Sequence, residues 1–441
     1  MTRKGYWGEF AKYTSLNVLG MIGLSFYILA DTYFVSKGLG ANGLTALNLA
    51  IPVYSFIHGS GLMIGMGGGT KYAICKSRGE DREADRIFTH AVGLAALFAV
   101  FFVLLGLFLS GPITALLGAD ASVYQMTKTY LQVILLFAPA FLLNNVLLCF
   151  VRNDGAPQLS MAAMIGGSLS NVVLDWVFIF PCGMGIFGAV FATGLAPIIS
   201  ILLLSPHFIR RKNRFHPVKC RPEGKRAAGI LSSGVPSLIT EVSSGVVIIV
   251  FNAIILQLSG NIGVAAYGVI ANLSLVVIAI YNGIAQGIQP LVSRSCGMGD
   301  AAGVRAFLRY AMTVMLLLSG LIYLTVFFGA SPLAALFNSE QNPLLQSIAE
   351  EGLRLYFIGC PFAGCSILLS IYFTSTERPR PAQVISLLRG FLVIIPMAFL
   401  LAFIGGIRGV WLAFPAAELL VAAVGLAVFF SRRGKRAGSP A

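Results

Sequence analysis

Two aspartates stand inside apolar stretches that are long enough to cross a lipid bilayer. Asp31 lies in Ile28-Leu-Ala-Asp-Thr-Tyr-Phe-Val35, and Asp175 lies in Leu174-Asp-Trp-Val-Phe-Ile-Phe180. A carboxylate at membrane depth costs about 3 kcal/mol or more, so it normally faces a cavity, a pairing partner or a transported ion. The two acids are therefore the first candidates for a site that binds a proton or a small cation.

The spacing of nearby residues indicates how helices would position these acids. Asn171 lies four residues before Asp175, so its amide shares one helix face with that carboxylate. Asp31 and Asp175 lie about four and five residues before the outer ends of the predicted helices 14–35 and 158–180. At about 1.5 Å per residue, the two carboxyl groups have nearly the same height. If the helices adjoin, the acids can share a proton or bind Na⁺. The alternative is that each acid extends to the lipid headgroups.

The second half of the chain has one deep acid that we identify, Glu241, about 13 residues into the predicted helix 228–256. We predict that Glu241 contacts a substrate, and the alternative is a hydrogen bond to a neighbouring serine that stabilises helix packing. Arg389 lies eight residues into the predicted helix 381–404. We expect its long side chain to extend toward the membrane surface rather than to pair with Glu241.

Composition places these residues in a polytopic membrane protein. The chain has 441 residues, 57% of them hydrophobic and 11% charged, and its mean hydropathy is +0.84. Soluble domains carry about 25% charged residues. The apolar runs predict an all-α protein with twelve transmembrane helices. We place these helices at 14–35, 44–69, 88–110, 128–151, 158–180, 186–208, 228–256, 264–290, 306–329, 350–374, 381–404 and 407–431.

The net charge of +14 has a topological explanation. Lys and Arg gather before the first predicted helix, in alternate loops, in the central loop and after the last helix, and such segments stay in the cytoplasm. Arg152, between the fourth and fifth predicted helices, is counted among these loop residues. We therefore expect a protein of the cell (cytoplasmic or inner) membrane with both termini cytoplasmic and with no nucleic-acid partner.

The sequence repeats itself at an offset of 220 residues. Gly40-Ala-Asn-Gly43 overlays Gly260-Asn-Ile-Gly263 without a gap, and Gly67 overlays Gly287. Because each repeat holds six predicted helices, an even number, both halves enter the membrane in the same orientation, which predicts two pseudo-symmetric lobes around a central cleft. The predicted division is an N-terminal lobe at 1–208, a basic cytoplasmic linker at 209–227 and a C-terminal lobe at 228–441.

Motifs that would support covalent chemistry are weak. Gly183-Met-Gly185-Ile-Phe-Gly188 has the spacing of a dinucleotide motif, but it follows a membrane helix and not a strand, so we interpret it as a turn. Seven cysteines form no CxxC pair, four histidines show no metal-ligand spacing, and no ATPase signature is present. We therefore expect no enzyme activity, no cofactor and no metal site apart from Na⁺ at the two aspartates.

The helix pattern and two motifs resemble a known family of transporters. Asp-Thr-Tyr-Phe-Val at 31–35 with Gly-x-x-Gly-Leu-x-Ala at 40–46, and Asn-x-x-x-Asp at 171–175, are similar to prokaryotic multidrug and toxic compound extrusion (MATE) transporters. The resemblance implies cation coupling at Asp31 and Asp175, together with Asn171 and Thr193. It also places Tyr27 and Asn145 where cavity-lining residues occur. Glu241 departs from the family pattern, which favours a substrate contact at that position.

The sequence thus predicts a secondary antiporter that works by alternating access. It would export organic, often cationic compounds in exchange for H⁺ or Na⁺, and we expect it to act as a monomer in the bilayer. The alternative is a lipid-linked oligosaccharide or peptidoglycan-precursor flippase of the same superfamily. A flippase would favour basic residues in the cleft, whereas the deep charges that we identify are acids apart from Arg389.

Overall fold

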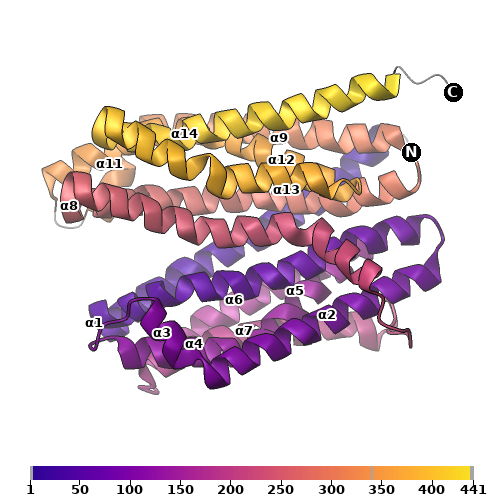
Figure 1. The fold of residues 1–441 in the computed structure, drawn as a ribbon, viewed down its shortest axis with the longest axis horizontal. Helices are drawn as coiled ribbons and strands as arrows, with labels where there is room; N and C mark the ends of the chain where they lie inside the picture. The colour runs from indigo at the N-terminus through magenta and orange to yellow at the C-terminus, as the bar shows by residue number, and fades with distance from the viewer. Residues whose placement is uncertain (1–2, 339–340, 438–441) are drawn as a thin grey trace.

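The chain forms two stacked groups of helices in the computed structural model, which describes residues 3–338 and 341–437. Figure 1 shows α2–α7 in one group and α9–α14 in the other, with both termini at the same end of the molecule. The longest helices, α1 (Arg3–Ser77) and α8 (Gly224–Gly297), contact each other at the junction. We call the end with the termini the linker end, because the segment joining the two groups also lies there (Figure 1).

The remaining elements follow in chain order through each lobe. The first lobe continues with α2 (Asp81–Phe108), α3 (Ser110–Leu116), α4 (Tyr124–Leu136), α5 (Ala138–Asn153), α6 (Pro157–Ile179) and α7 (Gly185–Ile209). The second lobe continues with α9 (Ala301–Phe328), α10 (Ala330–Phe337), α11 (Pro343–Tyr356), a 3₁₀ turn (Phe357–Gly359), α12 (Cys360–Ser375), α13 (Pro379–Leu387), a π turn (Leu388–Leu392) and α14 (Ile394–Ala437).

Three of the long helical stretches turn back on themselves at a glycine. The hydroxyl groups of Tyr27 and Tyr54 in α1 are 2.8 Å apart, although 27 residues of straight helix would span about 40 Å. The reversal is at Gly40, whose φ is +67°. The rings of Phe251 and Tyr267 stack at 5.6 Å across the equivalent reversal in α8. A positive φ favours glycine, because a side chain would collide with the backbone.

The number of membrane spans agrees with the prediction from sequence. The described residues contain eight helices long and apolar enough to cross a membrane, or nine when the bent pair α4–α5 is taken as one span. Two of them reverse at Gly40 and Gly260, and the stretch Pro379–Ser431 reverses at Gly406. Division at these three glycines gives the twelve predicted spans in the described part of the chain.

The helix ends differ from the predicted ones in a consistent way. At the linker end the helices extend past the apolar runs, so α1 begins by Arg3 where the sequence predicted residue 14. Amphipathic turns are stable there because one face packs on the neighbouring lobe. A prediction from mean hydropathy misses these turns because their other face is polar. The span predicted at 128–151 is interrupted at Phe137, where α4 and α5 meet at 47°. Pro139 in the first turn of α5 accounts for the break.

The internal repeat is also visible in the contacts between the two lobes. A Cβ placed on Gly67 would lie 2.0 Å from the Ile230 carbonyl oxygen and 3.0 Å from the Gly234 nitrogen. The equivalent position, Gly287, approaches Thr14 in the same way, with 2.8 Å to its Cα. Since Gly287 and Gly234 follow Gly67 and Thr14 by 220 residues, the two contacts are pseudo-symmetric. Small residues let the lobes pack tightly at the linker end.

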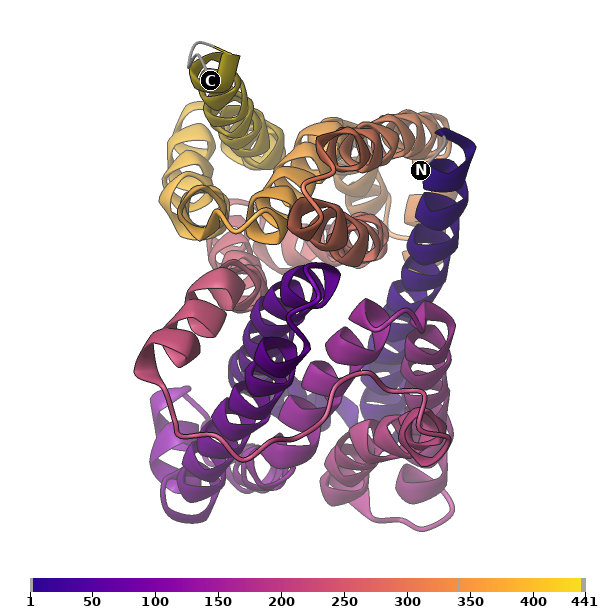
Figure 2. The same ribbon diagram turned by 90° about the vertical axis from the view of Figure 1, so that its right-hand side faces the viewer.

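The segment between α7 and α8 is fastened to the first lobe. Figure 2 shows it crossing the end of that lobe as an extended chain, and Phe215 is fully buried there against Tyr72, Phe88 and Phe150. Helix α8 already begins at Gly224, whereas the sequence placed the linker at 209–227, because its last basic residues form the first turn of the helix. The linker therefore has a fixed path over residues 210–223.

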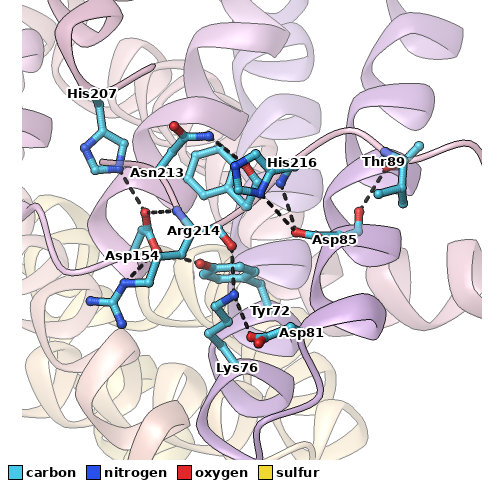
Figure 3. Close-up of polar contacts among 12 residues, drawn as sticks. Tyr72, Lys76, Asp81, Asp85, Thr89, Asp154, His207, Asn213, Arg214 and His216 are labelled. Carbon is cyan, nitrogen blue, oxygen red and sulfur yellow. Dashed lines mark hydrogen bonds and ion pairs between the residues drawn. The ribbon is translucent and has the colours of Figure 1, made fainter. Parts of the chain in front are cut away.

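Asp154 is the polar anchor of this linker (Figure 3). Its carboxylate accepts hydrogen bonds from the Tyr72 hydroxyl at 2.7 Å and from the Arg214 backbone N–H at 2.9 Å, and it pairs with His207 Nε2 at 2.9 Å. Lys76 adds a bond to the Arg214 carbonyl at 2.8 Å. The anchor joins α1, α5, α7 and the linker in one polar cluster.

Candidate functional site

Helices α1 and α6 bring Asp31 and Asp175 together. Gly20 and Gly23 let α6 approach α1 closely, since a Cβ on either would lie 3.1–3.3 Å from Met164 or Ile165. The two carboxyl groups lie within hydrogen-bonding range of each other, and 7% of Asp31 and 0% of Asp175 is exposed. The Oδ1 atom of each has no hydrogen-bond partner among the described residues. Two carboxylates in contact repel each other unless a proton or cation lies between them.

Asn171 and Thr193 lie directly beside this pair. In the amide orientation that satisfies its neighbours, Asn171 donates to Asp175 Oδ2 at 3.1 Å and accepts from the Thr193 backbone N–H at 3.2 Å. Tyr130 of α4, which the sequence analysis did not single out, is buried and hydrogen-bonds to Thr193. Oxygen atoms from α1, α4, α6 and α7 are therefore available around one carboxyl pair.

A cavity of about 90 Å³ lies next to the pair at the junction of the lobes. Asn171 and Thr193 are part of its wall, so they contact both the carboxyl pair and the cavity. Tyr27 and Asn145, predicted as cavity-lining residues, also lie in the wall. Apolar side chains line much of the rest, among them Met21, Leu24, Leu62, Phe141 and Leu148.

Glu241 enters the same cavity from the second lobe. Its Oε2 atom lies 3.5 Å from His58 Nδ1, and 29% of its side chain is exposed. Of the neighbouring serines, Ser243 and Ser244 donate instead to the backbone carbonyls of Thr240 and Glu241. His58 belongs to α1 and stacks on Tyr54 at 5.8 Å. The contact between His58 and Glu241 therefore connects the two lobes at the cavity wall.

Comparison with known proteins identifies the family. The family model described as MatE matches residues 18–177 and 236–400, which is most of the chain. This chain belongs to the MATE family. Members of the MATE family are transporters, so the chain is a membrane transporter and not an enzyme.

Curated relatives and solved structures resemble this MATE protein over nearly its full length. "Multidrug export protein MepA" of Staphylococcus saprophyticus is 24% identical over 93% of this chain and 90% of its own. The "FAD transporter" of Shewanella oneidensis is 26% identical over 94% and 91%. An outward-facing multidrug resistance MATE family transporter aligns with a TM-score of 0.91 at 22% identity, covering 98% of this chain and 96% of its own. These likenesses fix the twelve-helix, two-lobed fold.

Arg389 of this MATE protein does not extend to the membrane surface as predicted. Its Nε atom donates to Glu418 Oε1 at 2.6 Å, and 16% and 4% of the two side chains is exposed. Glu418 in α14 is also a deep acid of the second lobe, so Glu241 is not alone there. The sequence did carry this signal, since Glu418 stands within the apolar run 407–431. Burying an arginine beside an acid costs far less free energy than burying either charge without a partner.

The predicted position of Arg152 is also wrong. The sequence placed it in a cytoplasmic loop, but it is in the last turn of α5, only 2% of it is exposed, and it lines the cavity. One terminal nitrogen donates to Asn17 Oδ1 at 2.6 Å and to Gln286 Oε1 at 3.2 Å. The packing of α1 and α8 over the end of α5 buries the side chain, and no one-dimensional pattern reports that packing.

Proposed function

We propose that this MATE protein is a secondary antiporter that exports organic compounds in exchange for H⁺ or Na⁺. The observation that carries the proposal is the buried contact between Asp31 and Asp175, each with an unsatisfied oxygen. An ionised pair in this environment is unfavourable, and a bound proton or Na⁺ would remove the repulsion. The pair therefore suits a site that must take up and release a cation in every transport cycle.

Asn171 and Thr193 supply a route from ion binding to the substrate cavity. Both line the cavity, and Asn171 bonds to Asp175. When the pair loses its charge, the hydrogen bonds that Asn171 makes to the carboxylate weaken, and the wall of α6 and α7 can rearrange. An ion changes the conformational equilibrium only by binding one state more tightly, so the neutral pair must be favoured in the state that releases substrate.

The cavity wall supports an organic substrate with an apolar body. Its many aliphatic and aromatic side chains match such a body, and Glu241 offers a negative charge to a cationic group. The names of two relatives, a multidrug export protein and an FAD transporter, are consistent with organic cargo of different charge. We retain cationic compounds as the first class to test.

The test is export by the purified protein in proteoliposomes under an imposed pH or Na⁺ gradient, with a fluorescent cationic dye as cargo. Wild type would move dye under one of the gradients, and the active gradient would identify the ion. Asp31→Asn and Asp175→Asn would reduce gradient-driven export by roughly tenfold or more, since an amide cannot exchange a proton. Asp120→Asn is the matched control, because Asp120 is an exposed residue in the loop before α4. Export by Asp175→Asn at the wild-type rate would refute the coupling role.

One observation favours the alternative function, a flippase. The sequence argument against it was that deep charges in the cleft are acids, and Arg152 is a buried base in the cavity wall. A lipid-linked substrate carries phosphate, which arginine binds well. A flippase assay with a fluorescent phospholipid or lipid-linked precursor, run on the same vesicles, separates this function from dye export.

A further inference from the structure

Arg152 is a buried cation with no counter-ion among the residues that the structure describes. Its hydrogen bonds go to the neutral amides of Asn17 and Gln286 and, at 3.5 Å each, to the sulfur atoms of Met66 and Cys149. Its Nε atom has no partner, and none of the ion pairs among the described residues includes Arg152. The other deep arginine, Arg389, shows the usual arrangement, in which a buried carboxylate lies against the guanidinium.

A buried charge is normally paired, because neutral dipoles replace only part of the hydration that it loses. The guanidinium nevertheless keeps unused donor capacity, since it carries five N–H groups in a planar fork. It also lines a space from which a charged partner could reach it, the cavity at the junction of the lobes. The missing partner would therefore be a molecule that enters this cavity.

We propose that Arg152 binds an anionic group, a carboxylate or a phosphate, on the compound that the protein transports. Planar two-point contacts with these groups are what the guanidinium fork favours. Gln286 of the second lobe bonds to the fork through its oxygen, and its amide nitrogen donates no hydrogen bond among the described residues. Because Gln286 lines the same cavity as Arg152, that nitrogen can donate to the same anion, and one ligand would then contact both lobes.

The inference rests on the proposed transport function and narrows its substrate class. Glu241 and Arg152 line one cavity with opposite charges. Such a cavity favours a zwitterion, or an organic anion whose apolar body covers the rest of the wall, over a simple cation. The contacts of Arg152 with Asn17 and Gln286 also place the anion where α1 and α8 meet, and Asn17 itself donates to the Gly283 carbonyl at 3.0 Å.

The test compares two dyes that differ only at the anion: rhodamine B, which has a free carboxylate, and its ethyl ester. Equilibrium binding to the purified protein in detergent would be followed by fluorescence anisotropy. We expect Arg152→Gln to weaken binding of rhodamine B by roughly tenfold or more and to leave the ester unchanged. Arg152→Lys keeps the charge but loses the fork, so its affinity would be intermediate. Arg408→Gln is the matched control, because Arg408 is exposed at the other end of the molecule.

Three further measurements separate the outcomes. The size-exclusion profile and the Tm of each variant show whether it is folded. If Arg152→Gln does not fold, the binding comparison is made with Arg152→Lys. Arg152-dependent displacement of rhodamine B by the anionic lipid phosphatidylglycerol, and not by phosphatidylcholine, would identify a lipid headgroup as the anion, whereas Arg152-dependent dye binding that neither lipid displaces would indicate a soluble anion. Equal binding of both dyes by wild type and Arg152→Gln would overturn it. Because binding needs no gradient, Arg152-dependent binding without gradient-driven export would refute the antiporter proposal and leave the anion site standing.

Discussion

Asp154 is the residue on which the attachment of the linker depends. It is buried, and it receives bonds from Tyr72 and Arg214 and pairs with His207. We expect Asp154→Ala to lower the free energy of unfolding by about 3 kcal/mol, because it leaves buried donors without an acceptor. The measurement is the Tm in detergent by intrinsic fluorescence. Asp120→Asn, at an exposed loop position where the amide oxygen can still accept the local hydrogen bonds, serves as the control, and equal Tm values for both variants would show that the anchor does not stabilise the fold.

Arg389 and Glu418 allow a second prediction at the residue scale. Removal of one partner, as in Glu418→Leu or Arg389→Met, is expected to cost about 3–5 kcal/mol, because an unpaired buried charge remains. The double variant Arg389→Met, Glu418→Leu would be less damaged than either single variant, since an apolar pair of similar volume fills the space. A double-mutant cycle on Tm measures the coupling. Additive losses would show that the two side chains act independently.

Close helix packing at the linker end leads to a prediction at the scale of elements. A Cβ on Gly234 would lie 1.7 Å from the Met63 carbonyl oxygen, and this oxygen belongs to backbone that cannot turn aside. Gly234→Ala would therefore force α8 away from α1 and open the linker end. We expect faster maleimide labelling of a cysteine placed at Thr14, which is buried in the pseudo-symmetric contact with Gly287 at the same end.

The control for Gly234→Ala is another glycine within a helix. Gly93 lies in α2 with nothing within 4 Å of its Cβ position. Gly93→Ala is expected to leave labelling unchanged and to stabilise the helix slightly, by about 0.5–1 kcal/mol. Labelling at the wild-type rate in Gly234→Ala would mean that the helices yield without separating.

The elements were largely predictable from the sequence, and the interior contacts were not. Apolar runs predicted twelve spans because a bilayer demands about 20 apolar residues per crossing, and the reversals at Gly40 and Gly260 lie between predicted spans. The Asp31–Asp175 contact followed from equal height along two helices, on the condition that these helices adjoin. Burial of Arg152 did not, because a basic residue after an apolar run has the same pattern whether it faces cytoplasm or a neighbouring lobe.

At the scale of the whole molecule, the proposed alternating-access cycle requires the two lobes to separate at the end where they now touch. The pseudo-symmetric glycine contacts close the linker end. On the exposed surface of that end, Arg78 of the first lobe pairs with Glu377 of the second at 3.6 Å. Alternating access through a fixed central site means that this distance must grow whenever the cavity opens toward the linker end.

A covalent bridge at this pair should therefore stop transport without disturbing the binding site. Arg78→Cys and Glu377→Cys, introduced together after replacement of the seven native cysteines, can be joined by a short bis-maleimide. The uncrosslinked double variant should transport normally, because an exposed ion pair contributes only about 0–1 kcal/mol. Crosslinking should reduce gradient-driven dye export by roughly tenfold or more while dye binding in detergent persists. Each single-cysteine variant treated with the same reagent controls for simple modification. If the crosslinked protein still exported dye at full rate, the lobes would not need to part at the linker end, and the cycle would have to proceed by rearrangement of helices within a lobe.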